Sequence, residues 1–134
     1  LERALVAFDD STSNQIAVVT VSDLEGYSPA EFATRIGLDW QVGSEKFDNG
    51  IVLLVKPKIG NSYGEVFIAV GYGLEGALPD GKTGRMQDEY MIPFFRENKW
   101  DEGMMNGYKA FFNEVAKEYN YDSDMEPTVV AEED

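Results

Sequence analysis

The sequence predicts an α/β fold, a three-layer α/β/α sandwich built around a small mixed sheet. Residues 16–21 and 51–56 are continuous apolar runs, which is typical of strands covered on both faces. A helix start lies between them, so strand, helix and strand follow in the order of a right-handed parallel crossover. A third apolar run, 66–70, follows a loop rich in Gly, Asn and Ser, which predicts an antiparallel hairpin with 51–56. Helices on both faces of the sheet complete the predicted layers.

The first half of the chain holds two further predicted helical segments. Leu1, Leu5 and Phe8 recur at helical spacing, which predicts the last turns of a helix that starts before this sequence. The Ser-Pro-Ala-Glu motif at 28–31 matches a capping box with proline at the first helical position, so a helix begins there. We expect Gly43 to end this helix. Its buried stripe is predicted from four-residue spacing: Phe32, Ile36 and Trp40.

The second half of the chain is predicted to be helical. One helix begins near Asp80 or Thr83 and is kinked or ended by Pro93. Asn98 is expected to cap the next helix, which has one apolar face over five turns. Residues 121–134 contain six acidic and no basic residues, so we expect a domain at 1–120 followed by a disordered tail or linker. The apolar face of the last helix consists of Trp100, Met104, Tyr108, Phe111, Val115 and Tyr119.

Composition excludes several classes of site. The 134 residues include 11 basic and 25 acidic ones, and the formal charge of −14 argues against nucleic-acid binding. The chain has no histidine and no cysteine, so it has no imidazole or thiolate for a metal and no Ser-His or Cys-His mechanism. Oxygen ligands remain, and these favour calcium or magnesium over zinc. The longest apolar run is far shorter than the roughly 20 residues that span a bilayer.

The ends of the predicted hairpin gather acidic residues from distant parts of the chain. Residues before the first strand of a hairpin lie beside those after the second, so Asp48 should lie beside the loop 71–75. Converging carboxylates repel each other unless a cation neutralises them, and calcium takes six to eight oxygen ligands. We therefore predict a divalent-cation site for Ca²⁺, or alternatively Mg²⁺. Its predicted metal ligands are Asp48, Glu75, Asp80 and Asp88.

Each of these residues also has a structural explanation. Asp48 precedes an Asn-Gly turn and can bond to the backbone ahead of it. Glu75 can be a solvated residue in a glycine-rich connection, and Asp80 can cap the following helix. Asp88 falls inside that helix, where a charged side chain is more often simply solvated. Both explanations stay open at the level of sequence.

Two basic residues next to this stretch suggest a phosphate-binding alternative. Lys82 and Arg85 lie near a helix amino end and are predicted to hold a phosphate group beside the metal. Residues 76–83 also match the P-loop pattern formally. We do not expect a nucleotide, because Pro79 removes a backbone donor and Asp80 would face the phosphate charge.

The ordered set of motifs resembles the TPM domain family over about residues 1–120. The motifs are Asp48-Asn49-Gly50, the Gly-Tyr-Gly-Leu-Glu-Gly run at 71–76, Asp80, Gly84-Arg85, the Ile-Pro-Phe-Phe-Arg run at 92–96 and Gly103. This family includes thylakoid-lumen acid-phosphatase-like proteins and bacterial YgcG-like membrane-anchored proteins. The resemblance implies an α/β/α sandwich, calcium binding in the acidic pocket, an acid phosphatase activity and an extracytoplasmic location with an anchor outside this sequence. By motif it carries the metal-ligand role to Asp48, Glu75 and Asp80.

These observations lead to one main hypothesis and two rivals. The main hypothesis is an extracytoplasmic calcium-binding module that serves membrane-protein assembly or maintenance, with membrane proteins as partners. The first rival is a metal-dependent acid phosphatase acting on phosphomonoesters, for which no nucleophile stands out in the sequence. The second rival is a protein-interaction scaffold that uses the acidic surface.

Overall fold

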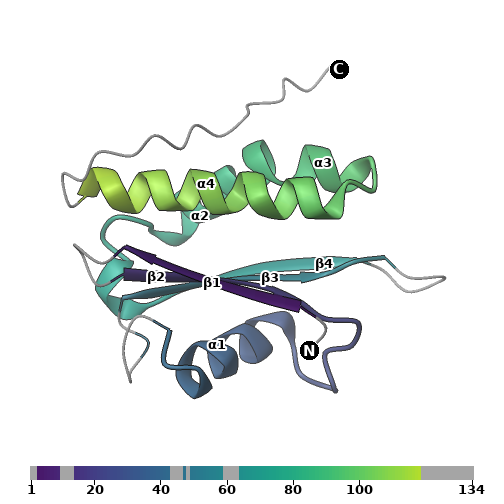
Figure 1. Cartoon of the computed structure of the whole chain (residues 1–134), viewed down its shortest axis with the longest axis horizontal. Coiled ribbons are helices and arrows are strands. Elements are labelled where there is room, and N and C mark those ends of the chain that lie inside the picture. Colours follow the sequence, from purple (N-terminus) through teal and green to yellow (C-terminus); the bar gives the residue numbers. More distant parts are fainter. Residues whose placement is uncertain (1–2, 10–13, 43–46, 48, 59–63, 119–134) are drawn as a thin grey trace. The chain divides into compact units, whose positions relative to one another are not determined.

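The chain divides into two compact units, Leu1–Glu75 and Gly76–Asp134, in a computed structural model that describes residues 3–9, 14–42, 47, 49–58 and 64–118 (Figure 1). The first unit contains the four strands and one α-helix, and the second contains three α-helices. The tail predicted at 121–134 lies outside the described residues. The elements are β1 (Arg3–Asp9), β2 (Asn14–Thr20), α1 (Pro29–Asp39), β3 (Gly50–Lys56), β4 (Glu65–Val70), the 3₁₀ turn η1 (Tyr72–Leu74), α2 (Asp80–Tyr90), α3 (Ile92–Arg96) and α4 (Trp100–Glu118).

The sheet has the strand order β1-β2-β3-β4. Strand β2 runs parallel to β3, with Ile16 opposite Ile51, and α1 forms the connection between them. Strand β4 is antiparallel to β3, with Val70 opposite Ile51. The predicted α/β class, with a parallel crossover and an antiparallel hairpin, is therefore confirmed.

The helix predicted at the amino end is wrong, because residues Arg3–Asp9 form strand β1. This strand pairs antiparallel with β2, from Arg3 opposite Thr20 to Asp9 opposite Asn14. A short apolar segment fits either helical or strand periodicity, and an available neighbouring edge decides between them. Here β1 pairs with β2 over seven residues. The hydrogen bonds between the two strands therefore override the helical spacing of the apolar residues.

The core of the first unit lies between α1 and one face of the sheet. Strand β3 is buried over its full apolar length, as its unbroken run of Ile, Val and Leu predicts. From α1, Ala33 and Ile36 pack into a cluster with Val52 and Leu54 of β3. Helix α1 contacts β3 and β4, and Figure 1 shows it lying along the sheet. The crossover helix is thus held by the same strand that organises the sheet.

Helix α1 begins as predicted and ends earlier than predicted. Ser28 accepts a hydrogen bond from the amide of Glu31, which confirms the capping box. At the other end Gln41 adopts a left-handed φ of 53°, and the amide of Val42 reaches back to the carbonyl of Gly37. This Schellman arrangement ends the helix before Gly43, which lies outside the described residues.

The predicted buried stripe of α1 needs one correction. Ile36 is buried and Phe32 is partly buried, as predicted, but Trp40 is 37% exposed. Trp40 occupies the C-cap position, with its backbone still in the right-handed helical region and its amide bonded to the carbonyl of Ile36. The predicted stripe is therefore continuous in direction but becomes more exposed at the end of the helix.

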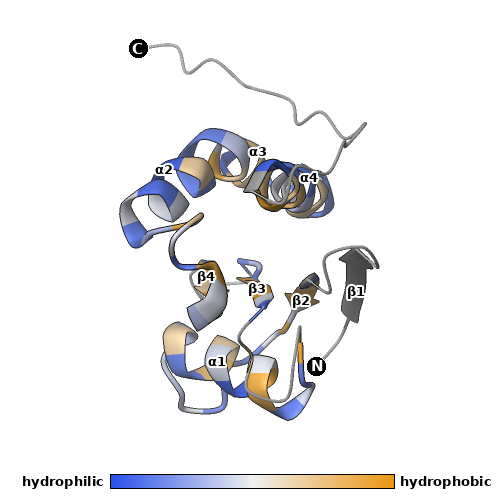
Figure 2. Ribbon diagram, turned by 90° about the vertical axis from the view of Figure 1, so that its left-hand side faces the viewer, coloured by the Kyte–Doolittle hydropathy of each residue, from blue (hydrophilic) through white to orange (hydrophobic). Residues whose placement is uncertain are grey.

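The second unit packs two short helices against a long one. Helix α2 is mostly hydrophilic (Figure 2) and buries only Thr83 and Met86. Pro93 lies in the first turn of α3, which agrees with the predicted break. The prediction that Asn98 caps the start of α4 is wrong. Asn98 has a φ of 59° and closes α3 instead, because its left-handed backbone lets the amide of Lys99 bond to the carbonyl of Phe94.

Helix α4 is the packing element of this unit. Four of its predicted apolar residues are buried, Tyr119 lies outside the described residues, and Trp100 stacks on Phe95 with ring centroids 4.7 Å apart. Among the described helices none is both long and apolar enough to cross a membrane. The four buried residues are Met104, Tyr108, Phe111 and Val115.

Two glycines let α4 approach its neighbours closely. A methyl group at Gly103 would overlap the ring of Phe95, and one at Gly107 would lie 2.5 Å from the sulfur of Met91. Asn106, between them, donates a 2.7 Å hydrogen bond to the carbonyl of Tyr90 at the end of α2. This bond satisfies a helix-terminal carbonyl that has no partner within its own helix.

We predict that Gly103→Ala lowers the free energy of unfolding by about 1–2 kcal/mol, because the added methyl displaces a buried, stacked ring. The matched control is Gly84→Ala on α2, where nothing lies within 4 Å of the added methyl. There the better helix propensity of alanine should stabilise the protein by up to about 1 kcal/mol. Urea unfolding measures both values, and equal stability of the two variants would contradict the close packing.

Candidate functional site

Two backbone hydrogen bonds bring the start of β3 next to residues that are distant in the sequence. The amide of Gly71 donates to the carbonyl of Gly50 at 2.7 Å, and the amide of Gln15 donates to the carbonyl of Asn49 at 3.1 Å. The first of these bonds confirms the predicted meeting of the hairpin ends for the backbone at Gly50 and Gly71, and the second joins Asn49 to β2.

The position of Gly50 is sterically demanding. A side-chain carbon there would overlap the carbonyl of Val42 and lie 2.6 Å from the ring of Phe47. Both Val42 and Phe47 are buried, so neither can move away at low cost. The Asn-Gly pair thus fixes the backbone at this edge of the sheet, in addition to permitting a turn.

The glycine-rich loop after β4 forms a compact turn. The amide of Leu74 bonds to the carbonyl of Gly71 at 2.9 Å, and the amide of Glu75 bonds to the carbonyl of Tyr72 at 3.3 Å. Leu74 is 1% exposed and anchors the turn, whereas Tyr72 is 79% exposed. Glu75 follows with an exposed side chain. The loop therefore offers a carboxylate and an aromatic ring to solvent beside the start of β3.

The four predicted metal ligands are placed unequally. Asp48 lies outside the described residues, immediately before Asn49. Glu75 belongs to the first unit, and Asp80 and Asp88 are exposed residues of α2 in the second. The capping explanation for Asp80 is wrong, since Pro79 is the N-cap residue and Asp80 is the first residue of the helix.

The described residues do not by themselves form a metal centre. No group of three carboxylates among them lies close enough to hold one ion. Asp80 and Asp88 are eight positions apart on one helix, which separates their backbones by about 12 Å along its axis. A calcium site at the hairpin end would therefore need Asp48 and backbone oxygens in addition to Glu75. The predicted ligand set stays a prediction.

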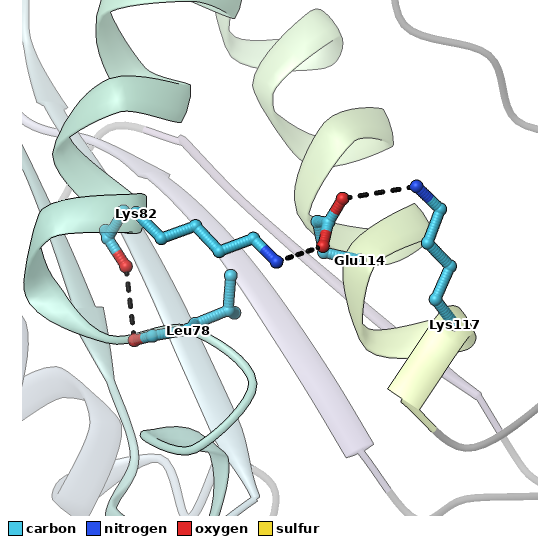
Figure 3. A network of polar contacts seen from close by, with 5 residues as sticks. Leu78, Lys82, Glu114 and Lys117 are labelled. Atoms are coloured by element: carbon cyan, nitrogen blue, oxygen red, sulfur yellow. Dashed lines mark hydrogen bonds and ion pairs between the residues drawn. The ribbon is translucent and has the colours of Figure 1, made fainter.

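Lys82, one of the two predicted phosphate ligands, already has a partner (Figure 3). Its ammonium nitrogen lies 2.7 Å from Oε2 of Glu114 on α4, and Lys117 approaches the other oxygen at 3.4 Å. The hydroxyl of Thr83 donates to the carbonyl of Leu78 at 3.3 Å, so this residue of the P-loop-like motif is also engaged. Arg85 is exposed on α2.

The ion pair changes the acidity of Glu114. Partial burial raises the pKa of this carboxyl, but the hydrogen bond from Lys82 and the charges of Lys82 and Lys117 lower it more. The pKa of Glu114 therefore lies below its ordinary value. The carboxylate stays ionised at neutral pH and links α2 to α4.

Comparison with known proteins identifies the family. A model of the TPM domain matches residues 1–114. The chain belongs to the TPM domain family. The solution structure of the N-terminal domain of a protein from P. gingivalis is similar to this TPM domain, with a TM-score of 0.68 and 29% sequence identity. The match covers 87% of this chain and 71% of that one. No curated protein gives a match.

The TPM domain also has a surface groove that the sequence did not predict. It lies beside α1 and is lined by aromatic, apolar and charged residues, Tyr27 and Trp40 among them. The signal that could have indicated it is the acidic Asp39 next to Trp40 at the helix end, but helical spacing assigned Trp40 to the buried stripe. A tryptophan at a C-cap position can equally point to solvent.

We predict that Glu114→Gln lowers the free energy of unfolding by about 0.5–1 kcal/mol at neutral pH, a modest value because the pair is partly exposed. A depressed folded-state pKa stabilises the protein above the ordinary carboxylate value of 4.5, and this stabilisation is lost as pH falls through the depressed pKa. The difference in unfolding free energy between the unmodified chain and the Glu114→Gln variant should therefore disappear in acid.

Urea unfolding between neutral and acidic pH measures this difference. Glu97→Gln is the control, because it breaks a weaker and more exposed ion pair. The side chain of Glu97 is 63% exposed, and its Oε1 lies 3.8 Å from Nζ of Lys99. It should change stability by less than about 0.5 kcal/mol at every pH. A loss in Glu114→Gln that persists unchanged at low pH would contradict the assignment to the ion pair.

Proposed function

We propose that this TPM domain is a calcium-binding module whose ion lies at the end of the β3–β4 hairpin. The observation that carries the proposal is the Gly71–Gly50 hydrogen bond of 2.7 Å, which holds the glycine-rich loop against the start of β3. Asp48 is covalently two residues from Gly50, and Glu75 is four residues from Gly71. Carboxylates at these positions can supply the hard oxygen ligands that calcium requires.

The chemistry of the chain supports a hard cation. With neither histidine nor cysteine, its metal donors are oxygens. The formal charge of −14 attracts divalent cations and disfavours anionic ligands. Magnesium is the alternative ion, but a loop of exposed carboxylates and backbone carbonyls suits the irregular coordination of calcium better.

The biological setting is part of the proposal. A weak oxygen-ligand site fills only where calcium is abundant, which is the case outside the cytoplasm. We therefore place the domain in an extracytoplasmic compartment, anchored by segments outside this sequence. There it serves membrane-protein assembly or maintenance, with membrane proteins as partners.

We expect calcium to bind with a dissociation constant of about 10⁻⁴–10⁻³ M, the range of extracellular modules. In amide NMR titrations the signals of Asn49, Gly50 and the 71–75 loop should shift. Asp48→Asn and Glu75→Gln should each weaken binding at least about tenfold, because each removes a charged ligand. Asp80→Asn and Asp88→Asn report whether α2 contributes.

The control is Asp23→Asn, which also removes one exposed carboxylate from the first unit. Asp23 follows β2, whose carboxyl end lies at the opposite edge of the sheet from Gly50. Its substitution should leave calcium affinity unchanged. Shifts confined to the acidic tail, with the Gly50 and Gly71 amides unmoved, would refute the proposed site.

A metal-dependent acid phosphatase is the second candidate, favoured by the positions of Lys82 and Arg85 in the first two turns of α2. It ranks lower because Lys82 is already bound to Glu114 at 2.7 Å. On this proposal the purified chain hydrolyses p-nitrophenyl phosphate with calcium or magnesium, and both Asp48→Ala and Arg85→Ala abolish the activity. Activity that survives in both variants would exclude this site.

A further inference from the structure

An open groove of about 270 Å³ lies beside α1, within the first unit. Residues 32, 35, 36 and 39 recur at three- and four-residue spacing, so they share one face of the helix. Tyr27 lines the groove before the helix begins, and Trp40 lines it after the helix ends. Each of these two rings is 37% exposed. The groove therefore has an aromatic residue from each end of α1.

Both ends of the groove are set by backbone turns. Before the helix, Glu25 and Gly26 have left-handed φ values of 55° and 85°, and the amide of Tyr27 bonds to the carbonyl of Leu24 at 3.0 Å. This is the geometry of a tight turn with two positive φ angles. After the helix, Gln41 has a left-handed φ of 53°, so the main chain turns directly after Trp40. The groove does not depend on a bound ligand to take shape.

The groove already shows that it can hold a cation. The guanidinium of Arg35 lies over the ring of Tyr27, 4.9 Å from the ring centroid. Such a contact is a cation–π interaction, which arginine makes well because its flat guanidinium is weakly hydrated. The side chain of Trp40 is 37% exposed, so part of this second aromatic surface is accessible to a ligand.

The charges around the groove favour a positive ligand. Glu25 and Asp39 line it, and Arg35 is its one positive lining residue. Over the whole segment 23–39 the sequence has four acidic residues and one basic residue. A carboxylate adjacent to an aromatic ring, as at Asp39-Trp40, can bind a guanidinium both by ion pairing and by stacking.

We propose that this groove binds an arginine side chain of a partner protein, with the guanidinium stacked on Trp40 and paired with Asp39. The arginine stem lies along Phe32, which lines the groove and is partly buried, whereas Ile36 lines the groove but is only 6% exposed. The acidic segment 121–134 of the chain itself has no basic residue and cannot supply this ligand. None of the residues that line the groove is a proposed calcium ligand, so this site is independent of the proposed calcium site.

The test uses the ¹⁵N-labelled chain and the peptide acetyl-Gly-Arg-Gly-amide at low ionic strength. The indole N–H signal of Trp40 and the amide of Asp39 should shift with increasing peptide. The signal of Trp100, which stacks on Phe95 in the other unit, should not move. The same peptide with citrulline, which has the shape of arginine without its charge, should bind at least about fivefold more weakly.

Four variants separate recognition from damage to the fold. Trp40→Ala and Asp39→Asn should each weaken binding at least about threefold. Asp23→Asn, which removes a nearby charge outside the groove lining, should change it less than twofold. Arg35→Gln should tighten binding about two- to fivefold, because it removes a like charge and frees Tyr27. A misfolded groove would not gain affinity.

Several results would overturn the proposal. Equal binding of the citrulline and arginine peptides would show that the groove does not select a cation. Shifts at Trp100 as large as those at Trp40 would show that the peptide does not bind preferentially at the groove. Tighter binding of the corresponding lysine peptide would reject a guanidinium ligand. Weaker binding in Arg35→Gln would show that the groove uses Arg35 to hold an anion.

Discussion

The double pairing of β3 is the constraint on which the first unit depends. This strand forms a parallel ladder with β2 on one side and an antiparallel ladder with β4 on the other. Because side chains alternate along a strand, a slip of one residue would turn Val52 and Leu54 away from α1. The register that avoids this slip also places Gly50 beside Gly71. Core packing and the candidate calcium loop therefore have a common cause.

The parts of the fold predicted from sequence are those with redundant local signals. The β3 run and the capping box at Ser28 each satisfy several requirements at once, and both were predicted correctly. Strand β1 was missed because its seven residues fit two periodicities and only its pairing with β2 decides between them. Asn98 was assigned to the wrong helix, since asparagine is favoured both at N-caps and in left-handed backbone.

The candidate site could also be predicted from the sequence only in part. Backbone convergence at the hairpin end follows from topology, so it could be predicted from two strands and a loop. Side-chain partnerships across the second unit could not, because they depend on the helix packing that Gly103 and Gly107 permit. The pairing of Lys82 with Glu114, thirty-two positions apart, is the example that matters most for function. A residue that looked available for phosphate is part of the link between α2 and α4.

The left-handed residues Glu25 and Gln41 bear on how the α1 groove could change in evolution or by engineering. They determine the path of the main chain at both ends of the helix, whereas the exposed lining residues, Arg35 and Asp39 among them, are side chains of the helix itself. Ligand preference could therefore be altered one side chain at a time without remodelling a loop. The scaffold thus separates the element that shapes the cavity from the groups that confer selectivity.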